Sequence, residues 1–276
     1  MLGRILSQHP EVAYWVEPRP VWMFGNAYRA HDELTEADLR PRIARHIDRR
    51  FDRFLRESSR SRFAEKTPSN CLRIRFIRAL YPDCRIVNII RDGRNVTRSI
   101  LQIRKSPPNK GLMSRRLRET VPWEWPAYLP LFFRTAWRTK VLRKPSAYWG
   151  PRPKGWKAWL DLPPHLQVAE QWRAVVEITL RDGRALPPEN YLELRYEDLM
   201  ARPIELIGQI LDFTELSASE AVTNYTRQHI DPERTHRWQG SLGDDQEREV
   251  EAHLSPMLDR LGYLAAKSAS PASSEG

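Results

Sequence analysis

The sequence has few of the residues that form disulfide frameworks or metal clusters. Only two cysteines occur in 276 residues, Cys71 and Cys84, and neither belongs to a C-x-x-C pair. No H-E-x-x-H motif is present either. Two isolated thiols indicate neither a disulfide framework nor a metal centre. We therefore expect no metal cofactor, and a reducing, cytoplasmic location is the default expectation.

Long apolar runs are also missing. The nearest candidate, YLPLFF at 128–133, is far shorter than the roughly 20 apolar residues that a membrane-spanning helix needs. Polar residues interrupt the apolar positions of the N-terminal segment MLGRILSQHPEV, which therefore lacks the apolar centre of a signal peptide. The sequence predicts no membrane span and no secretory leader.

Positive charge is abundant. The chain has 45 basic and 35 acidic residues, a net charge of +10, and 8 of the basic residues are Lys, which leaves 37 Arg (45 − 8). Guanidinium groups suit bidentate contacts to phosphate or sulfate, although coding composition can also favour Arg. A basic nucleic-acid-binding protein is one class that this charge suggests. Against it, the basic residues are spread along the chain and no recognised nucleic-acid motif occurs.

The hydrophobic pattern predicts an α/β protein with a parallel sheet flanked by helices. Hydrophobic residues make up 41% of the chain, enough for a globular core. Helical and strand patterns alternate through the first hundred residues, as in parallel sheets. We expect strands at 12–16, 62–65, 85–90 and 191–195, and helices at 2–8, 39–56, 72–80, 95–103, 165–182, 203–211 and 247–261. The pair His9-Pro10 ends the first helix, and we interpret His9 as structural.

Two regions depart from this pattern. Residues 104–164 are rich in proline, with Trp, Tyr and Arg interleaved, and we expect an inserted, partly helical subdomain. Its aromatic faces could form a wall for a substrate, or they could pack a lid on the core. Residues 265–276 are small and polar and predict a disordered tail. The remaining residues, 1–264, are expected to form one domain.

The segment RIVNIIRDGRNVTRSIL at 85–101 predicts an anion site. Arg91 follows an apolar strand, and ligands in parallel sheets bind beyond the carboxyl ends of strands. Gly93 permits a tight turn, and the helix that follows adds the favourable field of its N-terminus. Ser99, on that helix, could add a hydroxyl donor. Arg91 and Ser99 together could hold one phosphate, unless they are simply an exposed Arg and a surface Ser.

A second motif precedes this segment. EKTPSN at 65–70 and YPDCRIVNIIRDGRNVTRSI at 81–100 together resemble the P-loop-fold sulfotransferases, especially a bacterial family that shares features with tyrosylprotein sulfotransferases. In that family a K-x-P turn and an R-D-x-R-x-x-x-x-S segment bind 3′-phosphoadenosine-5′-phosphosulfate (PAPS). The resemblance includes SQHPEVAYWVEPRPVW at 7–22, YLELRYEDL at 191–199 and RLGY at 260–263, and covers about residues 1–264.

The resemblance implies a P-loop NTPase-like fold and a set of roles. Arg91 and Ser99 would bind the 3′-phosphate of PAPS, and Tyr196 would lie against the nucleotide. Lys66 would contact the sulfuryl group or the bridging oxygen. Glu17 would be the general base that takes the proton from the attacking acceptor. A fixed Lys can offset the charge on the leaving oxygen without a metal.

Two weaker candidates come from the same resemblance. Arg237 and Trp238 lie where similar enzymes place a late loop over the nucleotide, so both are candidate cofactor contacts. The acceptor is not predicted: a small metabolite, a carbohydrate, a lipid head group and a peptide tyrosine are all open, and so is the oligomeric state. The favoured interpretation needs no nucleic-acid partner.

The resemblance also exposes a difference from the family. Its members begin with a strand and a phosphosulfate loop of the form G-x-P-R-S-G-T-[ST], and this sequence starts after that point. We expect a start codon assigned too late; the alternative is a truncated, non-catalytic relative that keeps the 3′-phosphate pocket. A P-loop nucleotide kinase is disfavoured, because the sequence has no G-x-x-x-x-G-K-[ST] motif and no evident Mg²⁺ carboxylates.

Overall fold

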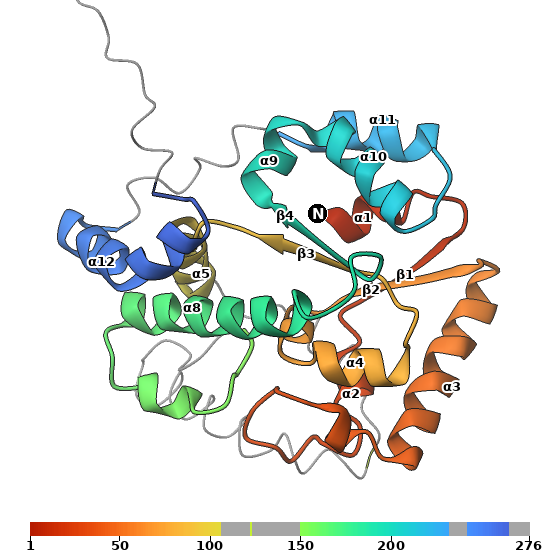
Figure 1. Cartoon of the computed structure of the whole chain (residues 1–276), viewed down its shortest axis with the longest axis horizontal. Helices are drawn as coiled ribbons and strands as arrows, with labels where there is room; N and C mark the ends of the chain where they lie inside the picture. The colour runs from red at the N-terminus through yellow and green to blue at the C-terminus, as the bar shows by residue number, and fades with distance from the viewer. Residues whose placement is uncertain (106–121, 123–149, 232–241, 265–276) are drawn as a thin grey trace, which may run out of the picture.

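The chain folds as an α/β structure of parallel strands flanked by helices (Figure 1). The computed structural model describes residues 1–105, 122, 150–231 and 242–264. Most of the proline-rich insertion predicted at 104–164 lies outside these residues. So do Arg237, Trp238 and the predicted tail.

The four strands of the described residues form two parallel pairs. They are β1 (Val12–Val16), β2 (Arg62–Lys66), β3 (Ile86–Ile90) and β4 (Tyr191–Arg195). β1 pairs with β2, and β3 pairs with β4. The predicted strand positions are therefore confirmed to within one residue at each end. The strands make two separate two-stranded ladders, and four of the five residues in β3 are only partly buried.

Helices and short 3-10 turns connect and cover the strands. In chain order they are α1 (Leu2–Leu6), α2 (Arg19–Trp22), η1 (Glu36–Asp38), α3 (Pro41–Ser58), η2 (Pro68–Leu72), α4 (Ile74–Leu80), α5 (Gly93–Lys105), η5 (Trp156–Trp159), α8 (Pro164–Gly183), α9 (Tyr196–Ala201), α10 (Pro203–Phe213), α11 (Glu220–His229) and α12 (Asp244–Arg260). Of these α-helices, the sequence did not predict α2, α9 or α11. No helix in the described ranges is long and apolar enough to cross a membrane.

One core cluster joins the two strand pairs. Its buried residues come mainly from α1, α9, α10 and α11, and all four strands contribute partly buried side chains to it: Tyr14, Ala64, Val87, Ile89, Leu192 and Leu194. These alternate positions point to the same face, as the two-residue period of a strand requires. Both pairs therefore belong to one layer, with this cluster on one side.

Two further clusters cover the opposite face. Trp15 of β1 and Phe63 of β2 pack on a cluster of residues from α2, α3 and α4. Ile90, at the end of β3, belongs to a cluster built mainly from α8 and α12. The apolar positions of α3 explain its place, because Ile43, Ile47 and Phe51 recur at four-residue spacing on its buried face. The carboxyl ends of both strand pairs thus lie between helical layers.

Candidate active site

Two predicted site residues meet where β1 and β2 end. Val16 and Lys66 are partners in the parallel ladder, and Glu17 follows Val16. The Lys66 ammonium donates to Glu17 Oε1 at 2.9 Å. The Lys66 side chain is about half exposed (53%), and that of Glu17 is 18% exposed. A carboxylate and an ammonium, both reachable from solvent, therefore face each other beyond the strand ends.

The backbone of Glu17 has an unusual conformation. Its φ is +52°, in the left-handed region, which non-glycine residues other than Asn and Asp adopt infrequently. The surrounding structure holds it there: the Glu17 N–H donates to the Lys66 carbonyl at 3.1 Å, and the Arg19 N–H donates to the Glu17 carbonyl at 2.7 Å. Such residues cluster at functional sites. This turn aims the carboxylate at Lys66 instead of continuing the strand.

A buried ionic network supports the loops on either side of this pair. Asp32 is fully buried. It accepts hydrogen bonds from Arg19 Nη2 at 2.6 Å, from the backbone N–H of Arg152 at 3.0 Å and from Ser69 Oγ at 3.4 Å. Burial disfavours the charged form of Asp32, but the guanidinium groups of Arg19, Arg152 and Arg73 outweigh burial and hold its pKa well below the usual range. The network ties the loop after Glu17 to the turn after Lys66.

Glu65, on β2, and Arg73, between η2 and α4, lie beside this network. Burial raises the pKa of Glu65 to about 7, although hydrogen bonds from Thr67 and Asn70 and the charge of Arg73 oppose the shift. Thr67 Oγ1 donates to Glu65 Oε2 at 2.8 Å, and Asn70 Nδ2 donates to Oε1. Arg73 is completely buried, and its three guanidinium nitrogens have no hydrogen-bond partner among the described residues. Burial lowers its pKa to about 10.

A second pair of predicted residues meets where β3 and β4 end. Ile90 and Arg195 are ladder partners, so Arg91 and Tyr196 follow side by side. The Arg91 guanidinium carbon lies 4.6 Å from the centroid of the Tyr196 ring, within cation–π range. Arg91 Nε and Nη2 are buried and have no hydrogen-bond partner in the part of the chain that the structure describes. Unsatisfied buried donors are costly, so these two N–H groups suit an anionic ligand.

The rest of the Arg-Asp-Gly-Arg turn has structural roles. Asp92 Oδ1 accepts from the Arg94 backbone N–H at 2.8 Å and so caps α5. The Arg94 guanidinium pairs with Asp92 at 2.6 Å and with Glu251 of α12 at 3.1 Å. Gly93 has no room for a side chain, because a Cβ there would lie 2.7 Å from the Trp172 ring. The close packing of this turn requires Gly at position 93. Arg94 forms ion pairs within the protein, whereas Arg91 follows the strand with two buried guanidinium nitrogens that have no partner among the described residues.

The other predicted positions divide into three outcomes. Ser99 lies on α5 and is partly buried; its share in the Arg91 site stays a prediction. Arg237 and Trp238 fall outside the described residues. The structural role of His9 is supported, because His9 is buried, its Nδ1 accepts from the Glu11 N–H at 3.2 Å, and its Nε2 lies 3.1 Å from the Ser217 carbonyl.

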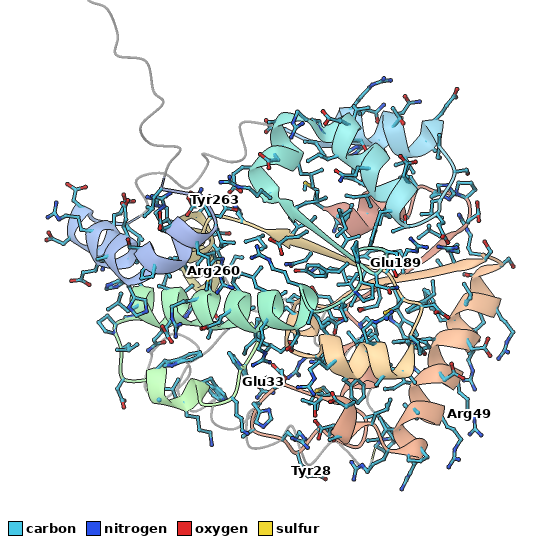
Figure 2. The ribbon with its side chains drawn as sticks, in the orientation of Figure 1. Tyr28, Glu33, Arg49, Glu189, Arg260 and Tyr263 are labelled. Carbon is cyan, nitrogen blue, oxygen red and sulfur yellow. The ribbon has the colours of Figure 1, made fainter. Side chains whose placement is uncertain are left out.

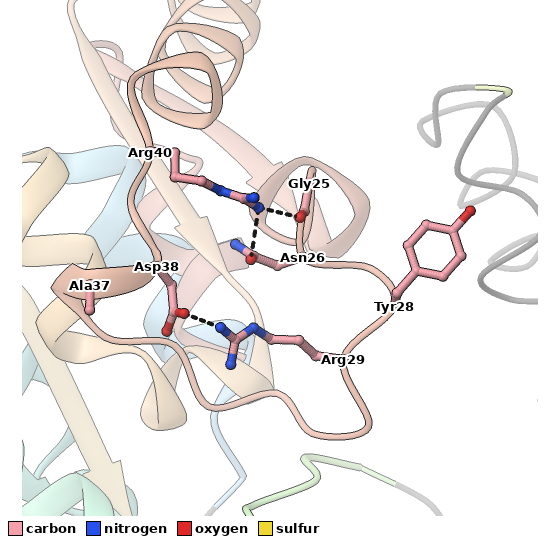
Figure 3. A pocket seen from close by; sticks show the side chains of 7 residues that line it. All are labelled: Gly25, Asn26, Tyr28, Arg29, Ala37, Asp38 and Arg40. Atoms are coloured by element: carbon pink, nitrogen blue, oxygen red, sulfur yellow. Dashed lines mark hydrogen bonds and ion pairs between the residues drawn. The ribbon is translucent and has the colours of Figure 1, made fainter.

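A pocket of about 470 Å³ lies elsewhere, beyond α2 (Figure 3). Two arginines line it, but Arg40 Nη2 donates to the Gly25 carbonyl at 2.6 Å and Arg29 pairs with Asp38. Tyr28 points away from the other lining residues (Figure 3). None of the predicted site residues lines this pocket. Because its guanidinium groups already have protein partners, we assign no ligand to it. Within the described residues, no group of three or more His, Cys, Asp or Glu side chains could hold a metal ion.

Comparison with known proteins identifies the class. A family model described as "Sulfotransferase family" matches residues 1–125 and 140–220. This is well over half of the chain, which therefore belongs to the sulfotransferase family. Among solved structures, the chain is similar to a sulfotransferase domain from the curacin biosynthetic pathway, with 12% identity, 76% of this chain and 68% of that chain covered, and a TM-score of 0.44. A comparison with curated proteins finds no match.

Sequence reasoning missed the residues that support the two pairs. Asp32 is a single acidic residue in a loop, and nothing in its neighbourhood predicts that Arg19, Ser69 and Arg152 converge on it. Glu197, which accepts from the Asp92 N–H, and Tyr263, which donates to Glu197, lie in segments that the resemblance did include, RYEDL and RLGY. Only their place in those two motifs could have indicated a role for these two residues.

Proposed function

We propose that the chain transfers a sulfuryl group from PAPS to a hydroxyl, or alternatively an amine, of an acceptor by in-line displacement. The observation that carries the proposal is the 2.9 Å contact between Lys66 Nζ and Glu17 Oε1 at the ends of two adjacent parallel strands. Membership of the sulfotransferase family supports sulfuryl transfer in general. Arg91 Nε and Nη2, buried and without a hydrogen-bond partner among the described residues, fit the 3′-phosphate that distinguishes PAPS from common adenine nucleotides.

The two members of the first pair would have complementary tasks. Glu17 would accept the proton of the acceptor hydroxyl as its oxygen bonds to sulfur. Lys66 would donate to the bridging oxygen, which gains negative charge as its bond to sulfur breaks. The ammonium has three N–H donors, so Lys66 can turn toward the donor and leave Glu17 available as a base. General-base catalysis of this kind is worth about 10²–10⁴-fold in rate.

The second pair would bind the other end of the donor. The Arg91 guanidinium would hold the 3′-phosphate, with Ser99 as an additional donor, and the Tyr196 ring would lie against the nucleotide. A charge-assisted hydrogen bond contributes about 1.5–3 kcal/mol, or roughly 10- to 150-fold in affinity. The donor itself supplies the sulfuryl group and the leaving 5′-phosphate, and the described residues supply positioning and proton transfer.

The test is transfer of labelled sulfur from PAPS. The chain is incubated with ³⁵S-labelled PAPS and acceptors of four classes: sugars, lipid head groups, tyrosine peptides and small hydroxylated metabolites. We expect labelled product with at least one class. Glu17→Gln should then lower turnover about 10²–10⁴-fold while its affinity for adenosine 3′,5′-bisphosphate stays within about twofold of native.

Glu11→Gln is the matched control, because Glu11 is exposed just before β1. It should leave turnover unchanged. Near-native turnover of Glu17→Gln would exclude Glu17 as the base. Failure of the chain to bind adenosine 3′,5′-bisphosphate at all would contradict the choice of donor.

A further inference from the structure

The backbone of the turn after β3 has side-chain contacts at three consecutive positions, two of them hydrogen bonds from or to separate side chains. The Ile90 carbonyl lies 3.2 Å from the Tyr263 hydroxyl, and the Arg91 carbonyl accepts from Trp172 Nε1 at 3.1 Å. The Asp92 N–H donates to Glu197 Oε1 at 3.1 Å. These partners come from α8, from α9 and from the residues after α12. Tyr263 lies where α12 approaches α9 (Figure 2).

Glu197 takes part in this arrangement twice. Its Oε2 accepts from the Tyr263 hydroxyl at 3.0 Å, while Oε1 accepts from the Asp92 N–H. Burial, followed by the charge of Glu197, raises the pKa of Tyr263 well above the usual range. The phenol therefore stays a hydrogen-bond donor at neutral pH. A carboxylate of α9 thus links the turn after β3 to the end of the chain's last described helix.

Two neighbouring residues of α9, Tyr196 and Glu197, contact Arg91 and the backbone that follows it. Tyr196 lies against the Arg91 guanidinium, with 4.6 Å between the guanidinium carbon and the ring centroid. Glu197, the next residue, holds the N–H that follows Arg91. α9 begins directly after β4, whose last residue is the ladder partner of Ile90. Because α9 follows β4 without a loop, Tyr196 positions the Arg91 side chain while Glu197 positions the backbone next to it.

We propose that Glu197 is a positioning residue for recognition of the 3′-phosphate. It acts through Arg91: by fixing the turn, it keeps Arg91 Nε and Nη2 directed toward the position where the anion binds. This inference rests on the function proposed above, because it takes the Arg91 ligand to be the 3′-phosphate of an adenosine nucleotide. Placement matters at this scale, since charge-assisted hydrogen bonds weaken when donors move away from linear geometry.

The experiment compares two nucleotides that differ only in the 3′-phosphate. Adenosine 3′,5′-bisphosphate and adenosine 5′-monophosphate are titrated by calorimetry into the native chain and into Glu197→Ala, well below the unfolding temperature. We expect the native chain to prefer the bisphosphate at least tenfold. Glu197→Ala should reduce this preference to that of Arg91→Ala and leave affinity for the monophosphate within about twofold. Glu205→Ala, at an exposed position on α10, is the control and should keep the native preference.

Two more variants separate positioning from stability and from charge. Glu197→Gln keeps a carbonyl acceptor for the Asp92 N–H and should restore most of the preference, although it removes the negative charge. Tyr263→Phe keeps the ring and removes the hydroxyl that Glu197 accepts, and we expect a partial loss of preference. It also stands in for Glu197→Ala if that variant does not fold.

The outcomes are distinguishable. If the native chain shows no preference for the bisphosphate, both the proposed donor and the role of Glu197 are wrong. A native preference that Glu197→Ala and Tyr263→Phe leave intact overturns the role of Glu197 alone. An equal loss of affinity for both nucleotides in the Glu197 variants would also overturn it, because it would indicate general damage to the nucleotide site.

Discussion

Replacing Glu65 by Gln should change how stability depends on pH. Burial raises the pKa of this carboxyl from 4.5 to about 7, so the folded state holds the proton more tightly than the unfolded state. The stabilisation is complete below pH 4.5 and is lost as pH rises through 7. A shift of roughly 2.5 units at about 1.36 kcal/mol per unit gives a loss of about 3 kcal/mol across that interval. Gln cannot ionise, and its carbonyl can still accept from Thr67 or Asn70.

The assay is urea denaturation of the native chain and Glu65→Gln at several pH values from 4.5 to 8. The difference between the two free energies of unfolding isolates Glu65 from the other titrating groups. We expect Glu65→Gln to gain about 3 kcal/mol relative to the native chain between pH 4.5 and 8. Glu57→Gln, at an exposed position on α3, should follow the native curve. If native and Glu65→Gln curves run parallel over this range, the pKa of Glu65 is not raised in the folded state.

Three other substitutions test the packing and the site. Gly93→Ala should destabilise the chain by about 1–3 kcal/mol, because its Cβ would lie 2.7 Å from the Trp172 ring; Gly208→Ala, with open space at its Cβ, should be neutral or stabilising in thermal denaturation. Asp32→Asn removes the buried charge on which Arg19, Arg73 and Arg152 converge and should cost about 3–5 kcal/mol in urea denaturation; a loss below about 1 kcal/mol would contradict the network. Lys66→Ala should lower sulfuryl transfer about 10²–10³-fold with affinity for adenosine 3′,5′-bisphosphate changed less than tenfold, whereas a larger loss of affinity would make Lys66 mainly a binding residue.

The strand positions could be predicted because their pattern is local. VAYWV and YLELR have the apolar, β-branched and aromatic character of strands, and both occupy the predicted residues. Strand order then places Glu17 beside Lys66 and Arg91 beside Tyr196, since parallel strands end at one edge. Thr35 and Asp38 form a capping box, but it caps the short turn η1, and α3 begins only at Pro41. Only the tertiary structure decides whether such a cap leads into a long helix.

What could not be predicted depends on contacts between distant segments. The helix α9 has six residues, too few for helical periodicity to be visible. The partners of Asp32 are separated from it by 13, 37 and 120 residues along the chain. The sequence predicts Glu65 only as a residue of an alternating strand. Its raised pKa depends on the distant segments that bury it. The division of the strands into two pairs likewise has no local signal.

The central claim is that Lys66 and Arg91 contact opposite ends of one adenosine nucleotide. A crystal structure of the chain with adenosine 3′,5′-bisphosphate tests it directly. We predict the 3′-phosphate on Arg91 Nε and Nη2, the base or ribose near Tyr196, and the 5′-phosphate toward Lys66. A nucleotide bound away from both strand-end pairs, or one whose 5′-phosphate points away from Lys66, would contradict the account.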